Sequence, residues 1–262
     1  MATANGDVET VSALIRSGAD VNKAGPDDET PLLVAAHRGS VPLMRMLLAS
    51  GARTDALRWN GETLLHAGVS SGHPDVVRLI LEKGVPVDAK EKRRGQTALH
   101  YAASDGNAQL VRLLIEEGAT VEAKSTSGIT PFWLAVQGAH QEAAAALLAA
   151  GADAAAEGTE EYRPVHLAAR SCQAPVMAVL LGAHVDLNPK TKTGMTPLHL
   201  AVAQNCLPTV RTLVEAGADA GSKDARGQTP LDYARRRRLK EIVAYFDQQK
   251  TANSKQEPPP DK

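Results

Sequence analysis

The stretch Thr196-Pro197-Leu198-His199-Leu200-Ala201 decides the fold of this chain. Threonine is a good N-cap, and proline suits the first helical position because its missing N–H would have no helical partner there. The stretch therefore predicts a short helix that begins at Pro197. The same marker recurs at Thr30, Thr63, Thr97, Thr130 and Thr229, and Arg163 takes the slot between Thr130 and Thr196. Successive markers are 33 or 34 residues apart, which indicates an internal repeat.

A second helix follows the marker helix in each repeat. Its apolar residues fall at helical spacing, as at Val76, Val77, Leu79 and Ile80. A glycine ends this helix because it adopts the left-handed conformation common at helix C-termini. This glycine stands 21 residues after the marker, at Gly51, Gly84, Gly118, Gly151 and Gly217. Two helices this short cannot bury their apolar faces alone, so neighbouring repeats must stack.

The motif text resembles that of the ankyrin-repeat family. Thr196 to Ala201 matches the pattern T-P-L-H-x-A in full, and Thr97-Ala98-Leu99-His100-Tyr101-Ala102 is a near match. The resemblance extends from about residue 2 to residue 247. It implies an all-α fold, an ankyrin-repeat solenoid of stacked helix-turn-helix units joined by β-turn or hairpin loops. It also implies a protein-binding function, but it does not identify the partner.

We predict one ankyrin-repeat domain over residues 1–247 and a disordered tail over residues 248–262. The tail contains Pro258-Pro259-Pro260 and has no apolar periodicity. The domain divides into a half repeat at 1–22, repeats near 26–58, 59–91, 93–124, 126–157, 159–190 and 192–223, and a C-terminal cap at 225–247. The half repeat lacks its first helix. Both a degenerate terminal cap and an excised fragment of a longer protein would explain this.

The repeat near 159–190 departs from the pattern of its neighbours. Glu161 and Arg163 stand where other repeats have glycine and threonine. The helix before it carries Ala143, Ala144 and Ala146 at positions where neighbours have larger apolar residues. Each missing CH₂ group forfeits roughly 0.8 kcal/mol of burial. We therefore expect the stack to be least stable between about residues 140 and 190.

Composition and charge exclude several functional classes. The chain has 262 residues with 29 Lys and Arg, 30 Asp and Glu, and a formal net charge of −1, so nothing global attracts nucleic acid or an anionic membrane. No apolar run approaches the ~20 residues that span a bilayer. The first residues lack a secretory signal. We expect a soluble, cytoplasmic monomer, with a nuclear location as the alternative because of the basic run Arg235–Arg238.

No residue cluster in the sequence predicts catalysis, cofactor binding or metal binding. His66, His100, His166 and His199 occupy the motif position where the family resemblance implies structural hydrogen bonds. Whole repeats separate these histidines, and no Cys or His pair has the close spacing of a zinc site. The chain has no phosphate-binding loop. We therefore expect a protein that is not an enzyme and that holds no cofactor and no metal.

The two cysteines, Cys172 and Cys206, fall in the loops between the helices of adjacent repeats. Packed helices lie on the order of 10 Å apart. A disulfide requires Cα atoms within ~7 Å of each other. We therefore predict free thiols, as in a reducing compartment.

The slot just before each marker is the best candidate for a partner contact. Its default residue is polar, but three consecutive repeats place Ile129, Tyr162 and Met195 there, and a row of apolar residues along a groove is a candidate binding patch. Tryptophan and arginine are enriched at interface hot spots. We hypothesise that these three residues form the apolar centre of a partner site and that Trp59, Arg93 and Arg94 flank it. The alternative is that the three side chains only cover the turns of their own repeats.

The leading functional prediction is an adaptor or scaffold that binds another protein in its concave groove. A second is a targeting or regulatory region of a larger protein such as an enzyme or a channel. A third is a nuclear factor, suggested only by the arginine run. We expect no nucleic-acid partner.

Overall fold

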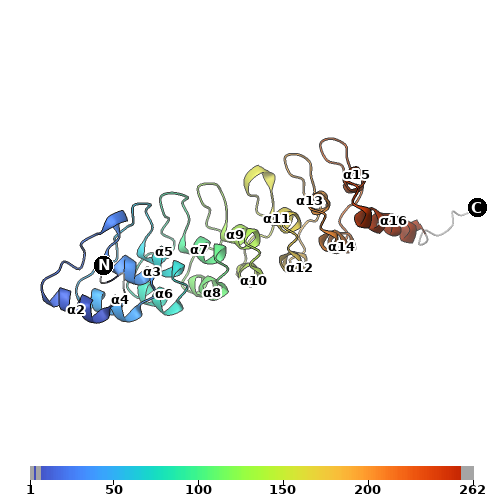
Figure 1. Ribbon diagram of the computed structural model, residues 1–262. Coiled ribbons are helices and arrows are strands. Elements are labelled where there is room, and N and C mark those ends of the chain that lie inside the picture. Colours follow the sequence, from blue (N-terminus) through green and yellow to red (C-terminus); the bar gives the residue numbers. More distant parts are fainter. Residues whose placement is uncertain (1–2, 4–6, 255–262) are drawn as a thin grey trace, which may run out of the picture. The chain divides into compact units, whose positions relative to one another are not determined.

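The computed structural model describes residue 3 and residues 7–254, and the chain forms two compact units, Met1–Asp153 and Ala154–Lys262 (Figure 1). We call them unit 1 and unit 2. Every regular element of the described residues is helical, so the predicted all-α repeat fold is confirmed. The ankyrin-repeat domain predicted over residues 1–247 spans both units and stays a prediction.

In its described residues from Val8 on, unit 1 consists of one leading helix and four helix pairs. It begins with α2 (Val8–Arg16) and the 3₁₀ turn η1 (Pro26–Asp28). The pairs are α3 (Pro31–His37) with α4 (Val41–Ala49), α5 (Leu64–Ser70) with α6 (Pro74–Leu81), α7 (Ala98–Ser104) with α8 (Ala108–Glu116), and α9 (Pro131–Gln137) with α10 (Gln141–Ala149). In Figure 1 the loops of unit 1 project beyond the first helices, and the second helices lie on the far side.

Unit 2, as far as the structure describes it, begins with the 3₁₀ turn η2 (Thr159–Glu161) and contains three helix pairs. These are α11 (Pro164–Arg170) with α12 (Ala174–Gly182), α13 (Pro197–Ala203) with α14 (Leu207–Glu215), and α15 (Pro230–Arg236) with α16 (Lys240–Ser254). Because α16 continues to Ser254, the prediction of a disordered tail from residue 248 is wrong for residues 248–254. Apolar periodicity detects an amphipathic helix, whereas residues of good helix propensity can extend a helix without that pattern. The rest of the predicted tail, residues 255–262, lies outside the described residues.

The markers begin the first helices as predicted. The Thr30 hydroxyl accepts the N–H of Leu33, and the Thr130 hydroxyl accepts the N–H of Trp133 at 3.3 Å. The helices that follow are buried on most sides; in α5, for example, residues Leu64 to Val69 are all buried. Neighbouring pairs therefore supply each other's core, which is the reason for stacking inferred from the sequence.

The loop between the two helices of a pair is where adjacent repeats approach most closely. Gly39 has φ +76°, and a Cβ atom there would lie 2.1 Å from the imidazole ring of His73 in the next repeat. Glycine is required there both by the backbone conformation and by the lack of space. In unit 2 the same slot holds Cys172, Asn205 and Arg238, all with φ between +55° and +57°.

Cys172 and Cys206 form a disulfide in unit 2, so the prediction of free thiols is wrong. Their Cα atoms are 5.9 Å apart, within the range that a disulfide spans. Cys172 occupies the left-handed slot of one repeat, and Cys206 is the N-cap residue of α14 in the next. These two positions correspond to Gly39 and His73. The prediction failed because it applied the distance between helix axes to loops that approach more closely.

The disulfide should contribute substantially to the stability of unit 2. It closes a sequence separation of 34 residues, and a cross-link of this length stabilises a fold by about 3–4 kcal/mol. We expect Cys172→Ser with Cys206→Ser to lower the free energy of unfolding of unit 2 by about this amount. Urea unfolding of the oxidised chain measures it. The wild type in reductant is the control and should match the double variant; equal stability in oxidising buffer would contradict the prediction.

A second left-handed position precedes each marker. It is glycine in most repeats, as at Gly128, but Asp28 and Glu161 occupy it with φ +58° and +61°. Aspartate tolerates this region because its short side chain bonds locally, whereas a longer side chain does so at a cost. Glu161, which replaces the glycine of other repeats, therefore holds a strained backbone conformation.

Replacing Glu161 with glycine should stabilise unit 2. The left-handed conformation costs a residue with a Cβ atom about 1 kcal/mol, and Glu161→Gly removes that cost. We expect the free energy of unfolding to rise by about 1 kcal/mol in urea titrations monitored by circular dichroism. The matched control is Glu241→Gly in the first turn of α16, where no such strain exists. Stabilisation by the control, or none by Glu161→Gly, would show that the strain is not relieved.

Candidate partner-binding surface

Hydrogen bonds of the main chain join the turn tips of unit 1 in a row. The N–H of Trp59 donates to Asp27 O at 3.3 Å, that of Lys92 to Asn60 O at 3.1 Å, and that of Thr126 to Arg94 O at 2.8 Å. We call these four tips, around residues 27–28, 59–60, 92–94 and 126–127, the tip row. Because the bonds use backbone atoms, the order and spacing of the tips do not depend on the side chains that they carry.

Trp59 is the outstanding exposed residue of the tip row. Its side chain is 62% exposed, more than the other two large apolar residues that are exposed in the described part of the chain, Leu14 and Leu57. Burying an indole is favourable, so exposing one wastes a large apolar surface unless another molecule covers it. Tryptophan is also enriched among the residues that dominate binding energy. Trp59 therefore has the exposure that a partner contact requires, and its contact with a partner stays a prediction.

Arg93 and Arg94 lie on the next tip and point their charge outward. Both residues are exposed, while Glu91 beneath them is only 3% exposed. The Glu91 carboxylate accepts the backbone N–H groups of Arg93 at 2.6 Å, Arg94 at 2.7 Å and Gln96 at 3.1 Å. The acid thus shapes the turn and leaves both guanidinium groups on the surface.

A network of charged groups supports the tip row from below. Arg58 forms ion pairs with Glu29 and, at 2.8 Å, with Glu62, and the Tyr101 hydroxyl donates to Glu62 at 2.9 Å. Burial alone would raise the pKa of Glu62, but hydrogen bonds from Arg58 and Tyr101 hold that pKa below its usual value. Burial and the bond to Glu62 raise the pKa of Tyr101. Sequence reasoning missed this network because two of its three links join residues that are 29 and 39 positions apart in the chain.

Ile129 does not have the exposure that the partner hypothesis requires. Its side chain is only 8% exposed. Its C=O accepts the N–H of Ser125 at 2.9 Å, and its own N–H donates to the Ser125 hydroxyl at 3.1 Å. The expectation of an exposed apolar centre is therefore wrong for Ile129. The tight turn folds this side chain inward, as the alternative interpretation held.

Tyr162 and Met195 occupy the corresponding slot in unit 2, and both are half-buried. The guanidinium of Arg170 lies 5.0 Å from the centre of the Tyr162 ring, and the His166 ring lies 5.6 Å from it. Tyr162 therefore packs on its own repeat. Ile129 belongs to unit 1, so only Tyr162 and Met195 share a unit.

The motif histidines bridge one repeat to the next. In His100, Nδ1 accepts the backbone N–H of Thr97 at 3.1 Å, and Nε2 is 3.0 Å from Ile129 O in the following repeat. His66 and His199 make the equivalent bonds to Gln96 O and Gln228 O. An accepting Nδ1 and a donating Nε2 define a neutral imidazole. Both ring nitrogens are used, which confirms the structural role implied by the family resemblance.

These buried histidines should make stability depend on pH. Burial lowers the pKa of His66, His100 and His199, and it lowers that of His166 to about 4. Between about pH 4 and the unfolded pKa of about 6.5, the unfolded chain therefore binds more protons than the folded one. Folding stability should thus be complete above about pH 6.5 and fall as the pH drops toward 4.

Urea unfolding at pH 4.5, 5.5 and 7.5 tests this dependence. His166 alone should account for up to roughly 3 kcal/mol, since each pKa unit corresponds to about 1.4 kcal/mol. The control is His166→Gln, which cannot titrate and should show a smaller loss between pH 7.5 and 4.5. A free energy of unfolding that stays flat over this range would contradict the neutral, hydrogen-bonded assignment.

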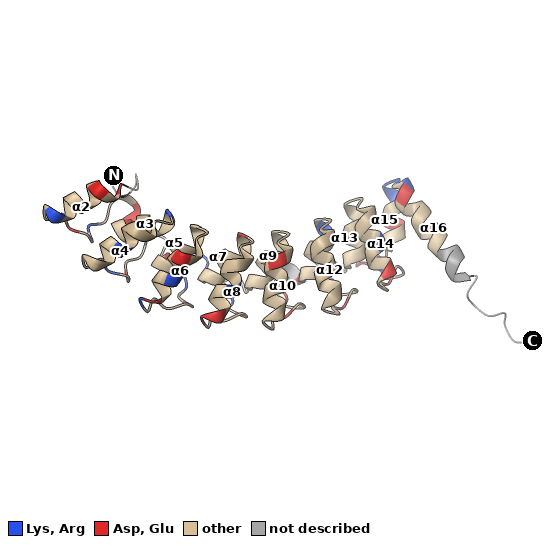
Figure 2. Ribbon diagram, turned by 90° about the horizontal axis from the view of Figure 1, so that it is seen from below, with Lys and Arg blue, Asp and Glu red and all other residues tan. Residues whose placement is uncertain are grey.

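The basic run Arg235–Arg238 lies at the end of α15, before the start of α16 (Figure 2). Most of its side chains contact other residues of unit 2. Arg235 pairs with Asp247 at 3.3 Å. Arg236 donates to Gln228 at 2.7 Å and lies 4.7 Å from the centre of the Tyr233 ring, and Arg237 donates to Ala203 O. These contacts favour the interpretation as a cap of the stack. The nuclear alternative stays a prediction.

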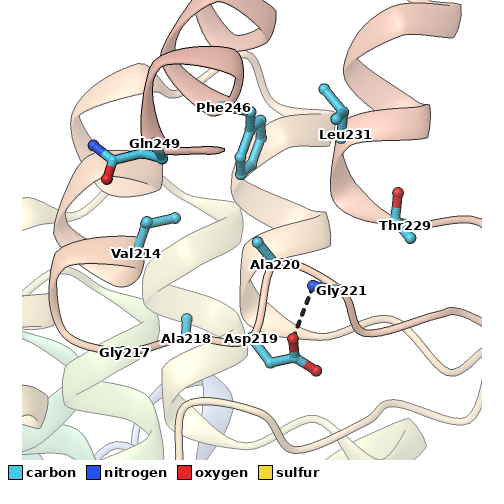
Figure 3. Close-up of a pocket in the computed structure, with 10 residues that line it drawn as sticks. All are labelled: Val214, Gly217, Ala218, Asp219, Ala220, Gly221, Thr229, Leu231, Phe246 and Gln249. Carbon is cyan, nitrogen blue, oxygen red and sulfur yellow. Dashed lines mark hydrogen bonds between the residues drawn. The ribbon is translucent and has the colours of Figure 1, made fainter. Parts of the chain in front are cut away.

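A cavity of about 550 Å³ lies in unit 2 where α14, α15 and α16 meet (Figure 3). Val214, Leu231 and Phe246 line its apolar side, and Asp219 lies at the other end. The Asp219 carboxylate accepts the Gly221 N–H at 2.8 Å and the Ser222 hydroxyl at 2.7 Å. Its charge is therefore used by its own loop. Asn188 and Gly221 occupy the same position in successive repeats. The Asn188 side chain accepts the N–H of Asp219 in the following repeat at 2.7 Å, whereas Gly221 has no side chain that could make this bond.

The described residues contain no group of three or more His, Cys, Asp or Glu that could hold a metal ion. A search of the same residues finds no helix with the length and apolar character that crossing a bilayer demands.

Comparison with known proteins agrees with the geometry of the repeats. The family model described as ankyrin repeats (3 copies) matches residues 1–91, 86–158 and 159–256. These segments cover nearly the whole chain. A search of the curated proteins finds no match.

Proposed function

Because the chain belongs to the ankyrin-repeat family, we propose that it is a non-catalytic adaptor or scaffold that binds a segment of another protein across the tip row of unit 1. Ankyrin repeats are generally protein–protein interaction modules. The observation that carries the proposal is the 62% exposure of Trp59 beside an exposed arginine pair.

The tip row is suited to binding because it is preorganised. Main-chain bonds of 2.8 to 3.3 Å hold neighbouring tips together, so the tip backbones need not be ordered when a partner arrives. A surface that is ordered beforehand loses less entropy on association and therefore binds more tightly. Aromatic and arginine anchors then supply most of the binding energy.

The proposal of a binding module in place of an enzyme is supported by the histidines. In His66, His100 and His199, both ring nitrogens are engaged by the scaffold. We further propose a monomeric, cytoplasmic protein that needs no cofactor.

Affinity purification with matched variants tests the proposed function. Trp59→Ala with Arg93→Gln and Arg94→Gln should reduce recovery of the partner at least tenfold, because hot-spot residues are removed. Thermal unfolding should not change, since all three side chains are exposed. The control is Arg45→Gln with Lys83→Gln, two exposed cations of the second-helix side of unit 1 that should leave recovery unchanged. Equal recovery with all three proteins would rule out the tip row.

A further inference from the structure

The tip row of unit 1 carries an ordered sequence of side chains. The first tip is acidic, with exposed Asp27 and Asp28; the second presents Trp59. The third is basic, with Lys92, Arg93 and Arg94, and the fourth is neutral, with Thr126 and Ser127. The ladder of main-chain bonds keeps this order in space, so a ligand along the row meets acid, indole and base in turn.

The positive charge of the third tip, carried by Lys92, Arg93 and Arg94, is exposed. No ion pair joins Lys92, Arg93 or Arg94 to an acid in the part of the chain that the structure describes. Two acids of the neighbouring turns are engaged elsewhere, because Glu91 accepts three backbone N–H groups and Glu62 accepts from Arg58 and Tyr101. The two guanidinium groups are therefore available to an external anion.

We propose that the tip row binds an extended acidic segment of a partner protein, whose carboxylates pair with Arg93 and Arg94 while a neighbouring apolar side chain covers Trp59. This inference rests on the proposed function and adds the chemistry of the partner. Arginine forms paired hydrogen bonds with carboxylates, and these bonds are stronger than neutral ones. A ring such as that of Trp59 supplies apolar contact area with little side-chain entropy to lose.

Charge along the row favours a peptide over a nucleic acid. A strand of nucleic acid carries a negative charge at every nucleotide, so one lying along the row would bring phosphates against Asp27 and Asp28 as well as Arg93 and Arg94. Unit 1 also has more acidic than basic residues overall. A protein segment, unlike a nucleic acid, can carry its acids at one end only, which suits a row that is basic at one tip and acidic two tips away.

Selection from a library of random 12-residue peptides displayed on phage, panned against the full chain, tests the partner chemistry. We expect the enriched peptides to share a run of Asp or Glu beside an apolar residue. A synthetic peptide of that sequence should bind at least tenfold more tightly than its amide twin, in which Asp and Glu become Asn and Gln. Arg93→Gln with Arg94→Gln should abolish this preference and its salt dependence, whereas Arg45→Gln with Lys83→Gln should preserve both.

The outcomes separate this inference from the proposed function. If the enriched peptides are neutral or basic but still require Trp59, the acidic partner is wrong and the binding surface stands. If no peptide is enriched, or if binding ignores Trp59, Arg93 and Arg94, both are wrong. A labelled single-stranded oligonucleotide of 12 nucleotides that binds the tip row more tightly than the acidic peptide would also overturn the inference.

Discussion

The fold depends on one constraint: a helix pair of this length buries its apolar side only against the next pair. Leu32, Leu43, Leu99 and Phe132 are almost wholly buried, yet each belongs to a first or second helix of only seven to nine residues. Burial therefore comes from neighbours in the stack, and stability is shared between repeats. Most of this burial comes from aliphatic side chains, since aromatics make up only 3% of the chain.

Polar contacts between repeats fix how each repeat is aligned with the next. The motif histidines carry a hydrogen bond from one repeat to the main chain of the next, at 3.0 Å for both His66 and His100. The tips are tied by separate main-chain bonds, such as that from Lys92 N to Asn60 O. A one-residue slip would leave these buried groups without partners, which is costly. The apolar faces thus drive stacking, and the polar bonds select one alignment.

This division of labour explains how the surface can acquire a binding function. Because backbone atoms and buried histidines hold the tips, the exposed residues of the tips are free to differ from repeat to repeat. The exposed side chains of Trp59, Arg93 and Arg94 contribute little to the stability of the fold, so they are free to contact a partner. Glu91 and Arg58, by contrast, would be taken for surface charges from the sequence, but the structure engages both of them in hydrogen bonds or ion pairs of the turns.

The family resemblance implied the role of the motif histidines, and the sequence by itself determined the repeat and its helices. These follow from local chemistry, namely the Thr-Pro cap, the helical spacing of apolar residues and the glycine stops, which act within one repeat. Tertiary structure decided what depends on distances between repeats. It paired Cys172 with Cys206, turned Ile129 inward, and brought Glu29, Arg58, Glu62 and Tyr101 into one network. The period and the motif set the order of the repeats. The closest approach of two loops and the direction of a side chain in a tight turn depend on packing between repeats. A local sequence pattern does not specify that packing.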